Sequence, residues 1–299
     1  MTYKPARKAS LFAILAVLCW STSPTAFKLG LRYQDPYQLL TGATIASLGI
    51  LGLFILASGR YREMRSFTWK DAGFSLLMGL LNPVAYYLIL FKAYSLLPAQ
   101  VAQPLNMVWP IVLVLVSIPM LKQRIGWKSI GAMLLSFSGV VLVSLQGGTG
   151  GMVPGSRLGI ILALSTSLVW SFYWIYNARD KRDPLVRLFL NFLFAAVILT
   201  LAGFFRSSGF PDSLQAWGIS VYVGFFEMGI TFVLWLLAMH YAPATDRISN
   251  LVYMAPFLNL IIVRLVLDER IFQTTVFGII LLVSGILIQN TTRRHATTG

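Results

Sequence analysis

The sequence is poor in the residues that form metal and catalytic centres. It contains one cysteine, Cys19, two histidines and ten acidic residues in a chain of 299. A single cysteine excludes an internal disulfide and any multi-cysteine zinc or iron–sulfur site. His240 and His295 are too few and too isolated from each other to form a metal cluster. We therefore expect no metal and no cofactor.

Charged residues are also scarce, at 11% of the chain, whereas an average soluble domain has about 25%. Hydrophobic residues make up 57%, and the mean hydropathy is +0.74. One soluble domain cannot hide that much apolar surface, but a set of membrane spans of about 20 residues each can. The composition excludes a soluble enzyme, a disordered chain and a protein with a single anchor, and it indicates the lipid bilayer as a partner.

The net charge of +14 would suit nucleic acid only if the basic residues formed a clustered patch or stripe. They lie instead in short loops between apolar runs, where they orient spans in a bilayer. We expect no nucleic-acid partner.

Stretches that lack Asp, Glu, Lys and Arg predict ten membrane spans. They run 10–27, 36–59, 72–91, 93–121, 129–156, 158–178, 188–205, 213–245, 248–263 and 271–292. The span 213–245 is interrupted only by Glu227. The span 248–263 is short, and the apolar part of the Arg264 side chain extends it. Lipid offers the backbone no hydrogen-bond partners, and these runs do not alternate as barrel strands would. The sequence thus predicts an all-α integral membrane protein.

The basic residues are unevenly divided between the two sides of these spans. With the amino terminus inside, 17 of the 24 Lys and Arg residues fall on the cytoplasmic side and 7 on the other. The positive-inside rule therefore places both termini in the cytoplasm. We expect a multi-pass protein of the inner (plasma) membrane.

The chain contains an internal repeat with an offset of 146 to 150 residues. The matched pairs are Trp20-Ser21 with Trp170-Ser171, Asp35-Pro36 with Asp183-Pro184, Pro110 with Pro256, Lys122-Gln123-Arg124-Ile125 with Asp268-Glu269-Arg270-Ile271, and Ser138-Gly139 with Ser284-Gly285. They divide the chain into a first five-span unit, 1–146, a glycine-rich linker, 147–156, and a second unit, 157–299.

Because five is an odd number, the second unit is expected to enter the membrane upside down relative to the first. Inverted repeats are typical of alternating-access transporters, in which two near-equivalent halves meet at a midplane site. The alternative is a duplicated scaffold that transports nothing. A fused pair of units forms a complete pathway, so a monomer is expected.

These elements resemble the drug/metabolite transporter superfamily, whose tandem EamA-type five-helix repeats cover essentially the whole chain. The resemblance rests on the Trp-Ser and Asp-Pro pairs, the proline of the fourth span of each unit and the Leu-x-x-Arg elements at Leu121 and Leu267. Within that superfamily the chain is similar to the YddG-type aromatic amino-acid exporters. The resemblance implies ten helices around a central cavity lined by spans 1, 3, 4, 6, 8 and 9, and efflux of small metabolites.

Glu227 is the one acidic residue deep within a span. A charge at that depth is costly, so such a residue usually faces a cavity or a partner. An offset of 145, one short of the range of the repeat, pairs Glu227 with Asn82 in the third span. A spacing of four places Glu227, Thr231 and Trp235 on one helix face. Two readings stay open: a proton acceptor or partner for a substrate ammonium group, and a neutral glutamate hydrogen-bonded between helices.

Aromatic and amide side chains gather near the span centres, where an interfacial belt does not explain them. They are expected to line a cavity, with plain packing as the alternative. Together with the face of Glu227 they give the candidate substrate-binding set: Trp20, Asn82, Tyr86, Asn106, Trp109, Trp170, Tyr173, Trp174, Glu227, Thr231, Trp235 and Tyr253.

An aromatic wall favours flat, apolar or cationic small molecules through stacking and cation–π attraction. No Lys or Arg lies at midspan, which disfavours phosphorylated sugars. We expect export of aromatic amino acids and hydrophobic or cationic drug-like compounds. The alternatives are a broader multidrug or nucleotide-sugar carrier and a non-transporting receptor or scaffold. The spans lack paired carboxylates or a deep histidine, which argues against an enzyme. Pro110 and Pro256 are read as gating hinges or as static kinks.

Overall fold

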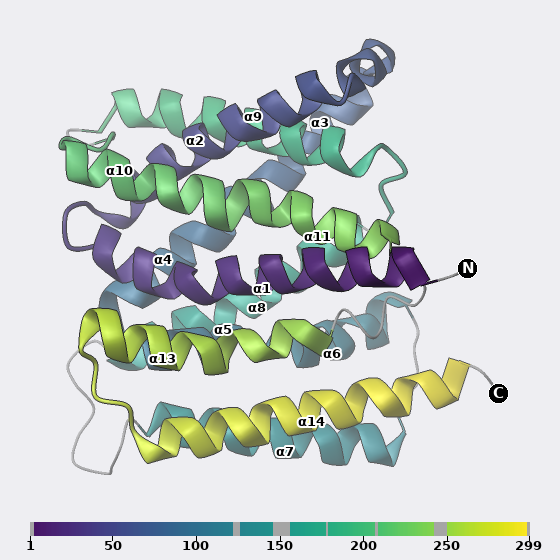
Figure 1. Ribbon diagram of the computed structural model, residues 1–299, viewed down its shortest axis with the longest axis vertical. Helices are drawn as coiled ribbons and strands as arrows, with labels where there is room; N and C mark the ends of the chain where they lie inside the picture. Colours follow the sequence, from purple (N-terminus) through teal and green to yellow (C-terminus); the bar gives the residue numbers. More distant parts are fainter. Residues whose placement is uncertain are drawn as a thin grey trace.

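The computed structural model describes residues 3–121, 126–145, 156–177, 179–206, 209–241 and 250–297. Throughout these residues the chain is helical and has no strand, which confirms the expected all-α class. Most of the helices lie side by side with their axes roughly parallel or antiparallel, and the two ends of the chain lie at the same end of this bundle (Figure 1). The linker expected at 147–156 falls almost entirely outside the described residues.

The helices follow one another with short connections. Their bounds are α1 Tyr3–Gly30, α2 Pro36–Ala57, η1 Arg60–Ser66, α3 Trp69–Gly79, η2 Leu80–Ala85, α4 Tyr86–Leu96, α5 Ala99–Asn106, α6 Trp109–Leu121, α7 Trp127–Ser144, α8 Ser156–Asn177, α9 Pro184–Phe204, α10 Leu214–Val223, η3 Gly224–Gly229, α11 Ile230–Tyr241, η4 Asn250–Met254, α13 Ala255–Leu267 and α14 Gln273–Thr297.

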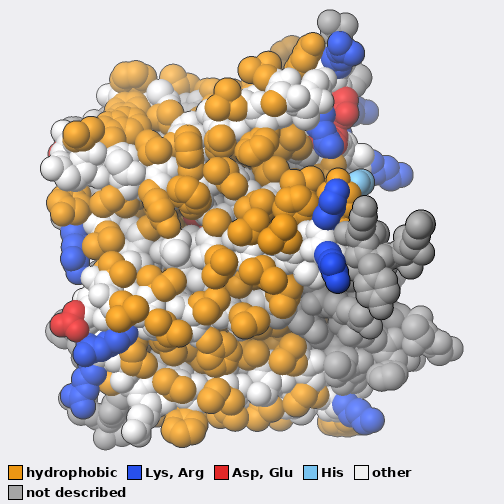
Figure 2. All heavy atoms as spheres, viewed as in Figure 1, with side chains coloured by type: hydrophobic (Ala, Val, Ile, Leu, Met, Phe, Trp, Pro, Cys, Tyr) orange, Lys and Arg blue, Asp and Glu red, His pale blue; other side chains and the backbone are white. Residues whose placement is uncertain are grey.

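Seven helical stretches are long and apolar enough to cross a membrane, and three shorter ones are apolar. The seven are Arg7–Gly30, Pro36–Ala57, Trp69–Leu96, Ala99–Val116, Arg157–Asn177, Pro184–Phe204 and Leu214–Tyr241, and the shorter ones are Ile130–Ser144, Leu251–Leu267 and Gln273–Ile288. Figure 2 shows hydrophobic side chains across the middle of the bundle and Lys and Arg at its two ends. The molecule is a multi-pass membrane protein.

The helices α2 and α9 begin in the same way and pack antiparallel. Each follows an aspartate N-cap, Asp35 or Asp183, and has proline in its first turn. The hydroxyl of Tyr37, at the start of α2, donates to the carbonyl oxygen of Leu199 near the end of α9, at 2.6 Å. At this same end Asp35 forms an ion pair with Arg206 at 3.8 Å, and at the opposite end Arg60 forms an ion pair with Asp183.

The helices α7 and α14 also pack antiparallel, with their backbones very close. The Ser136 hydroxyl donates to the Leu282 carbonyl oxygen at 3.0 Å. A side chain on Gly139 would strike the carbonyl oxygen of Gly278, and one on Gly285 would strike the turn around Ala132. Small residues at these crossings allow the close approach that stabilises helix pairs in lipid.

Two spans of 28 residues, Trp69–Leu96 and Leu214–Tyr241, are interrupted by π-helical turns near their middles. The turn η2 contains Asn82 and Pro83, and η3 contains Glu227. Pro83 supplies no N–H to the helical ladder, and Asn82 has non-helical backbone angles. Such π segments frequently mark functional sites, and these two occupy corresponding positions in the two halves of the sequence.

The fourth predicted span is interrupted between α5 and α6, and in the ninth the 3-10 helix η4 passes directly into α13, details that the apolar runs did not reveal. Pro110 is the second residue of α6, and Pro256 is the second residue of α13. Proline is well tolerated in a first turn because its missing N–H has no partner there. On the neighbouring α8, the hydroxyls of Ser167 and Ser171 donate to the carbonyl oxygens of Asn106 and Trp109, both at 3.3 Å.

Candidate functional site

A cavity of about 540 Å³ lies among α1, α4, α5, α6, α8, α11, η3 and η4. Its volume is typical of a site for one small organic molecule. Nine of the twelve sequence-predicted binding residues line it: Trp20, Tyr86, Asn106, Trp109, Trp170, Trp174, Glu227, Trp235 and Tyr253. Among the lining residues that sequence reasoning missed are Ser23, Phe27, Tyr87, Gln103, Arg179 and Phe232.

The other three predicted residues, Asn82, Tyr173 and Thr231, are buried outside the cavity lining. Tyr173 stacks on Trp170 with 5.4 Å between ring centroids and also lies beside Asn82. The Thr231 hydroxyl donates to the carbonyl oxygen of Phe226 within its own helix. The three side chains therefore belong to the layer behind the cavity wall, where they support the helices that carry it.

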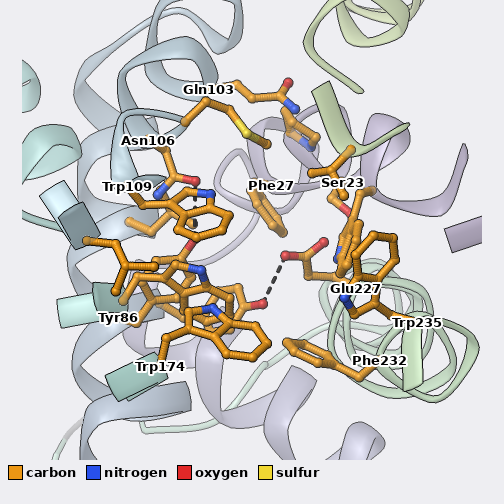
Figure 3. Close-up of a pocket in the computed structure, with 18 of the residues that line it drawn as sticks. Ser23, Phe27, Tyr86, Gln103, Asn106, Trp109, Trp174, Glu227, Phe232 and Trp235 are labelled. Carbon is orange, nitrogen blue, oxygen red and sulfur yellow. Dashed lines mark hydrogen bonds between the residues drawn. The ribbon is translucent and has the colours of Figure 1, made fainter. Parts of the chain in front are cut away.

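Glu227 presents its carboxyl group to the cavity from the π-helical turn η3. Its side chain is 9% exposed, and the Tyr87 hydroxyl donates to Oε1 at 2.9 Å. Figure 3 shows the carboxyl group between the two walls, with Ser23 beside it. Tyr87 was missed because it follows directly on Tyr86, and successive residues of a regular helix point about 100° apart. Their rings meet edge-on at 4.8 Å, and both line the cavity.

The walls on either side of Glu227 are mainly aromatic. Trp170 stands at the centre of one wall, with its ring centroid 4.6 Å from that of Tyr86 and 6.0 Å from that of Trp174. Trp20 and Trp235 meet at 5.4 Å on the opposite wall. Phe232 connects the two walls, with centroids 6.3 Å from Trp20 and 6.4 Å from Trp170. A flat apolar group placed between the walls would contact rings on both sides.

Polar groups are few and well separated around this wall. Asn106 is fully engaged: its Oδ1 accepts from the Tyr86 hydroxyl at 3.1 Å, and its Nδ2 donates to Thr166 at 2.8 Å. Within the described part of the chain, Gln103 Oε1 and Trp174 Nε1 are buried and have no hydrogen-bond partner. Buried polar groups normally find partners, so these two atoms are exceptions among the residues that line the cavity.

One end of the cavity is closed by aromatic packing. Phe27 packs against Tyr94 and Phe91, with centroid distances of 5.2 and 4.8 Å. Just beyond, Lys28 Nζ donates to the carbonyl oxygens of Tyr94 and Leu97, both at 3.0 Å. This lysine joins the end of α1 to the end of α4.

A polar contact between distant parts of the sequence extends this closed end. Glu269 Oε1 accepts from the backbone N–H of Ala99 at the start of α5, at 3.1 Å. The Gln100 side chain donates to the Arg270 carbonyl oxygen at 2.6 Å and accepts from the Phe272 N–H at 3.1 Å. The loop after α13 is thereby fastened to the start of α5.

The sequence matches a known family twice. The model of the EamA-like transporter family matches residues 7–145 and again residues 157–291. A solved crystal structure has a TM-score of 0.66 to this chain at 23% identity, covering 96% of this chain and 98% of the other. That similarity shows a shared fold over nearly the full length.

Several curated relatives are transporters. The aromatic amino acid exporter YddG of Ancylobacter novellus is 26% identical over 84% of this chain and 86% of its own length. The uncharacterized transporter YvbV of Bacillus subtilis is 22% identical over 97% and 94%. A probable amino-acid metabolite efflux pump of Escherichia coli is 21% identical over 94% of each chain. These relatives point to a protein that moves molecules rather than one that converts them.

Proposed function

The chain belongs to the EamA-like transporter family, and from that premise we propose a secondary exporter of small aromatic metabolites. Its cargo is aromatic amino acids and hydrophobic or cationic compounds, which it moves by alternating access as a monomer in the inner (plasma) membrane. The proposal agrees with the relatives named as an aromatic amino acid exporter and as an amino-acid metabolite efflux pump. The observation that carries it is the cavity with facing aromatic walls around a single carboxyl group.

We propose that ten spans form two inverted five-helix units, 1–146 and 157–299, joined by 147–156, with both termini in the cytoplasm. The antiparallel packing of corresponding helices, α2 with α9 and α7 with α14, supports this arrangement. A two-fold axis in the membrane plane makes corresponding helices antiparallel, whereas an axis along the membrane normal makes them parallel. The reciprocal ion pairs at the ends of α2 and α9 fit the first case.

Contacts between the units are reciprocal as well. The helix α1 packs on α11 and α13 of the second unit, and the corresponding helix α8 packs on α4 and α6 of the first. In an interface with two-fold symmetry, when an element of one half contacts the other half, the corresponding element of the second half makes the equivalent contact. Two such halves can exchange conformations, which supports transport through a site that they share.

Pro110 and Pro256 are our candidates for the gating hinges. Each lies next to the point where a short helical piece, α5 or η4, meets a longer helix of the same predicted span. A change of backbone angles at these points would move the cavity-lining pieces relative to their continuations. The twelve binding residues predicted from sequence remain our candidates for contact with the cargo or for support of its site.

Counterflow in proteoliposomes tests this function. Trp170→Ala should lower the exchange rate of phenylalanine and tryptophan about tenfold, because it removes the ring at the centre of one wall. Trp127→Ala is the matched control, since Trp127 is 87% exposed and lies outside the cavity lining. Unchanged exchange in Trp170→Ala would contradict the aromatic site, and tight binding with no exchange by the wild type would favour a receptor or scaffold.

A further inference from the structure

We infer that the cavity selects aromatic amines without a carboxylate over zwitterionic aromatic amino acids. The inference rests on the proposed transport function and narrows its substrate class. It follows from the charges around the cavity: the carboxyl group of Glu227 is buried between the aromatic walls, whereas Arg179, the basic residue of the described lining, is exposed.

The first step is the position of Glu227. Its Oε1 accepts a hydrogen bond from Tyr87, and the Ser23 side chain is a second hydrogen-bond partner. The described residues supply it with no ion pair. A buried carboxylate without a cationic partner is costly. A cargo ammonium group placed between the walls would supply the missing charge.

The second step is the ring geometry around the same point. Trp20 and Trp235 meet at 5.4 Å, and Phe232 lies 6.3 Å from Trp20 across an edge-on contact. Figure 3 shows Trp235 beside Glu227 and Phe232 below it, and all three rings line the cavity. Ring faces attract cations, and the attraction grows as water is excluded. The rings and the carboxylate therefore both favour a cationic group.

The third step concerns a cargo carboxylate. Arg179 is the basic residue on the described lining; it is exposed and lies beyond the end of α8 at Asn177. An α-amino acid carries its ammonium and carboxylate on one carbon atom, so the carboxylate would lie near Glu227 and be repelled by it.

At the start of α6, the described backbone N–H groups do not stabilise a cargo carboxylate either. Helix N-termini attract anions, and residues at the start of α6 line the cavity. There Pro110 has no N–H, and the amides of Ile111 and Val112 donate to the Val108 carbonyl oxygen at 2.9 and 3.3 Å. The unpaired Trp174 Nε1 is a single neutral donor, which cannot replace the hydration of a carboxylate.

The experiment compares four ligands with one aromatic ring: phenethylamine, phenylalaninamide, phenylalanine and 3-phenylpropanoate. Binding to the purified full-length protein is followed by tryptophan fluorescence, which reports on Trp20, Trp170, Trp174 and Trp235 in the walls. We expect the two carboxylate-free amines to bind at least tenfold more tightly than phenylalanine, and 3-phenylpropanoate to bind most weakly. Counterflow of phenylalaninamide and phenylalanine, corrected with protein-free liposomes, should follow the same order.

Glu227→Gln should reduce the preference for phenylalaninamide over phenylalanine to less than threefold, because the carboxylate that distinguishes them is gone. Glu63→Gln is the matched control, since Glu63 is exposed in η1 and far from the lining. If Glu227→Gln does not fold, the second measurement is the preference of the wild type for phenylalaninamide over phenylalanine at raised salt concentration. Salt screens a buried charge only weakly, so a preference that arises from the buried Glu227 carboxylate should not change.

The outcomes separate the two proposals. If none of the four ligands exchanges above protein-free liposomes, the transport function fails. If phenylalanine exchanges as fast as phenylalaninamide, or if Glu227→Gln keeps the wild-type preference, transport stands and the selectivity for amines is wrong.

Discussion

Gly139 and Gly131 lie two turns apart on α7 and have different surroundings. A Cβ added to Gly139 would meet the carbonyl oxygen of Gly278 and the backbone nitrogen of Leu282, whereas one added to Gly131 would meet nothing within 4 Å. Backbone atoms cannot move aside as the end of a flexible side chain can. At Gly139, therefore, the missing side chain permits the close packing of α7 on α14, and at Gly131 it serves no packing purpose.

We predict that Gly139→Ala destabilises the protein by about 1–3 kcal/mol, because the α7–α14 crossing must open. Gly131→Ala should be neutral or stabilise by up to about 1 kcal/mol, since alanine favours helix and reduces the freedom of the unfolded chain. Thermal unfolding in the same detergent measures both. Equal shifts for the two variants would show that the crossing does not depend on Gly139.

Single residues also show where prediction from sequence ends. The repeat placed Trp20 and Trp170 in corresponding positions, and both line the cavity. Thr231 was assigned to the same helix face as Glu227, yet its hydroxyl bonds to Phe226 within the helix and the next residue, Phe232, lines the cavity. The π-helical turn at Glu227 changes the rotation per residue, so regular helical spacing does not carry across it.

At the scale of elements, the start of α9 combines local and long-range interactions. Asp183 accepts from the backbone N–H groups of Leu185 and Val186 at 2.9 and 3.1 Å, and it pairs with Arg60 beyond the end of α2. Partial burial acts to raise the pKa of Asp183, but the hydrogen bond from Arg60 and those from the backbone outweigh it and hold the pKa below its usual value. The ionised form is therefore more stable in the folded protein than in the unfolded one.

Asp183→Asn should lower stability by about 0.5–1 kcal/mol at neutral pH, since asparagine keeps the N-cap but loses the charge, and Arg60 is partly exposed. The pH dependence of this contribution follows from the lowered pKa of Asp183. The contribution of Asp183 is complete above the unfolded pKa, about 3.9, and disappears as the pH falls through the lower folded pKa. Thermal unfolding from pH 7 to pH 3 should show the wild type and the variant converging; a difference that grows toward acid would contradict the ion pair.

Elements differ in how far the sequence specified them. The Asp-Pro pairs at Asp35 and Asp183 correctly located the starts of α2 and α9, because an N-cap and a first-turn proline act within a few residues. The sequence pointed to a hinge or kink at Pro110 and at Pro256, which lie next to the break between α5 and α6 and next to the change from η4 to α13. The apolar runs themselves continue through both places and do not mark them. At the first break, hydroxyls of α8 satisfy carbonyl groups of the neighbouring span, a contact between residues about 60 positions apart.

For the whole molecule, the proposed inversion makes a direct geometric prediction. Tyr61 and Phe205 follow the ends of α2 and α9 and are exposed. The two helices are antiparallel, so these residues should lie on opposite sides of the membrane. The matched pair Gln123 and Glu269 would serve equally, but Gln123 lies outside the described residues.

Single cysteines at Tyr61 and Phe205, in a chain with Cys19 replaced by alanine, test this arrangement. A membrane-impermeant thiol reagent added to intact cells should label Phe205→Cys, and it should label Tyr61→Cys only after the membrane is opened. Background labelling is measured in the cysteine-free chain. If intact cells label both positions, the two units are not inverted.

The sequence by itself determined that the chain is helical and crosses a membrane many times. The length of a segment and its lack of charged residues favour its insertion into the bilayer, whatever tertiary contacts it makes. It also identified the family through short repeated elements. Only the tertiary structure decided which side chains enclose the cavity: Tyr87 opposite Glu227, Lys28 and Glu269 at the closed end, and Asn82 behind the wall. These relations depend on helix rotation at π-helical turns and on contacts between distant segments, which no local pattern in the sequence encodes.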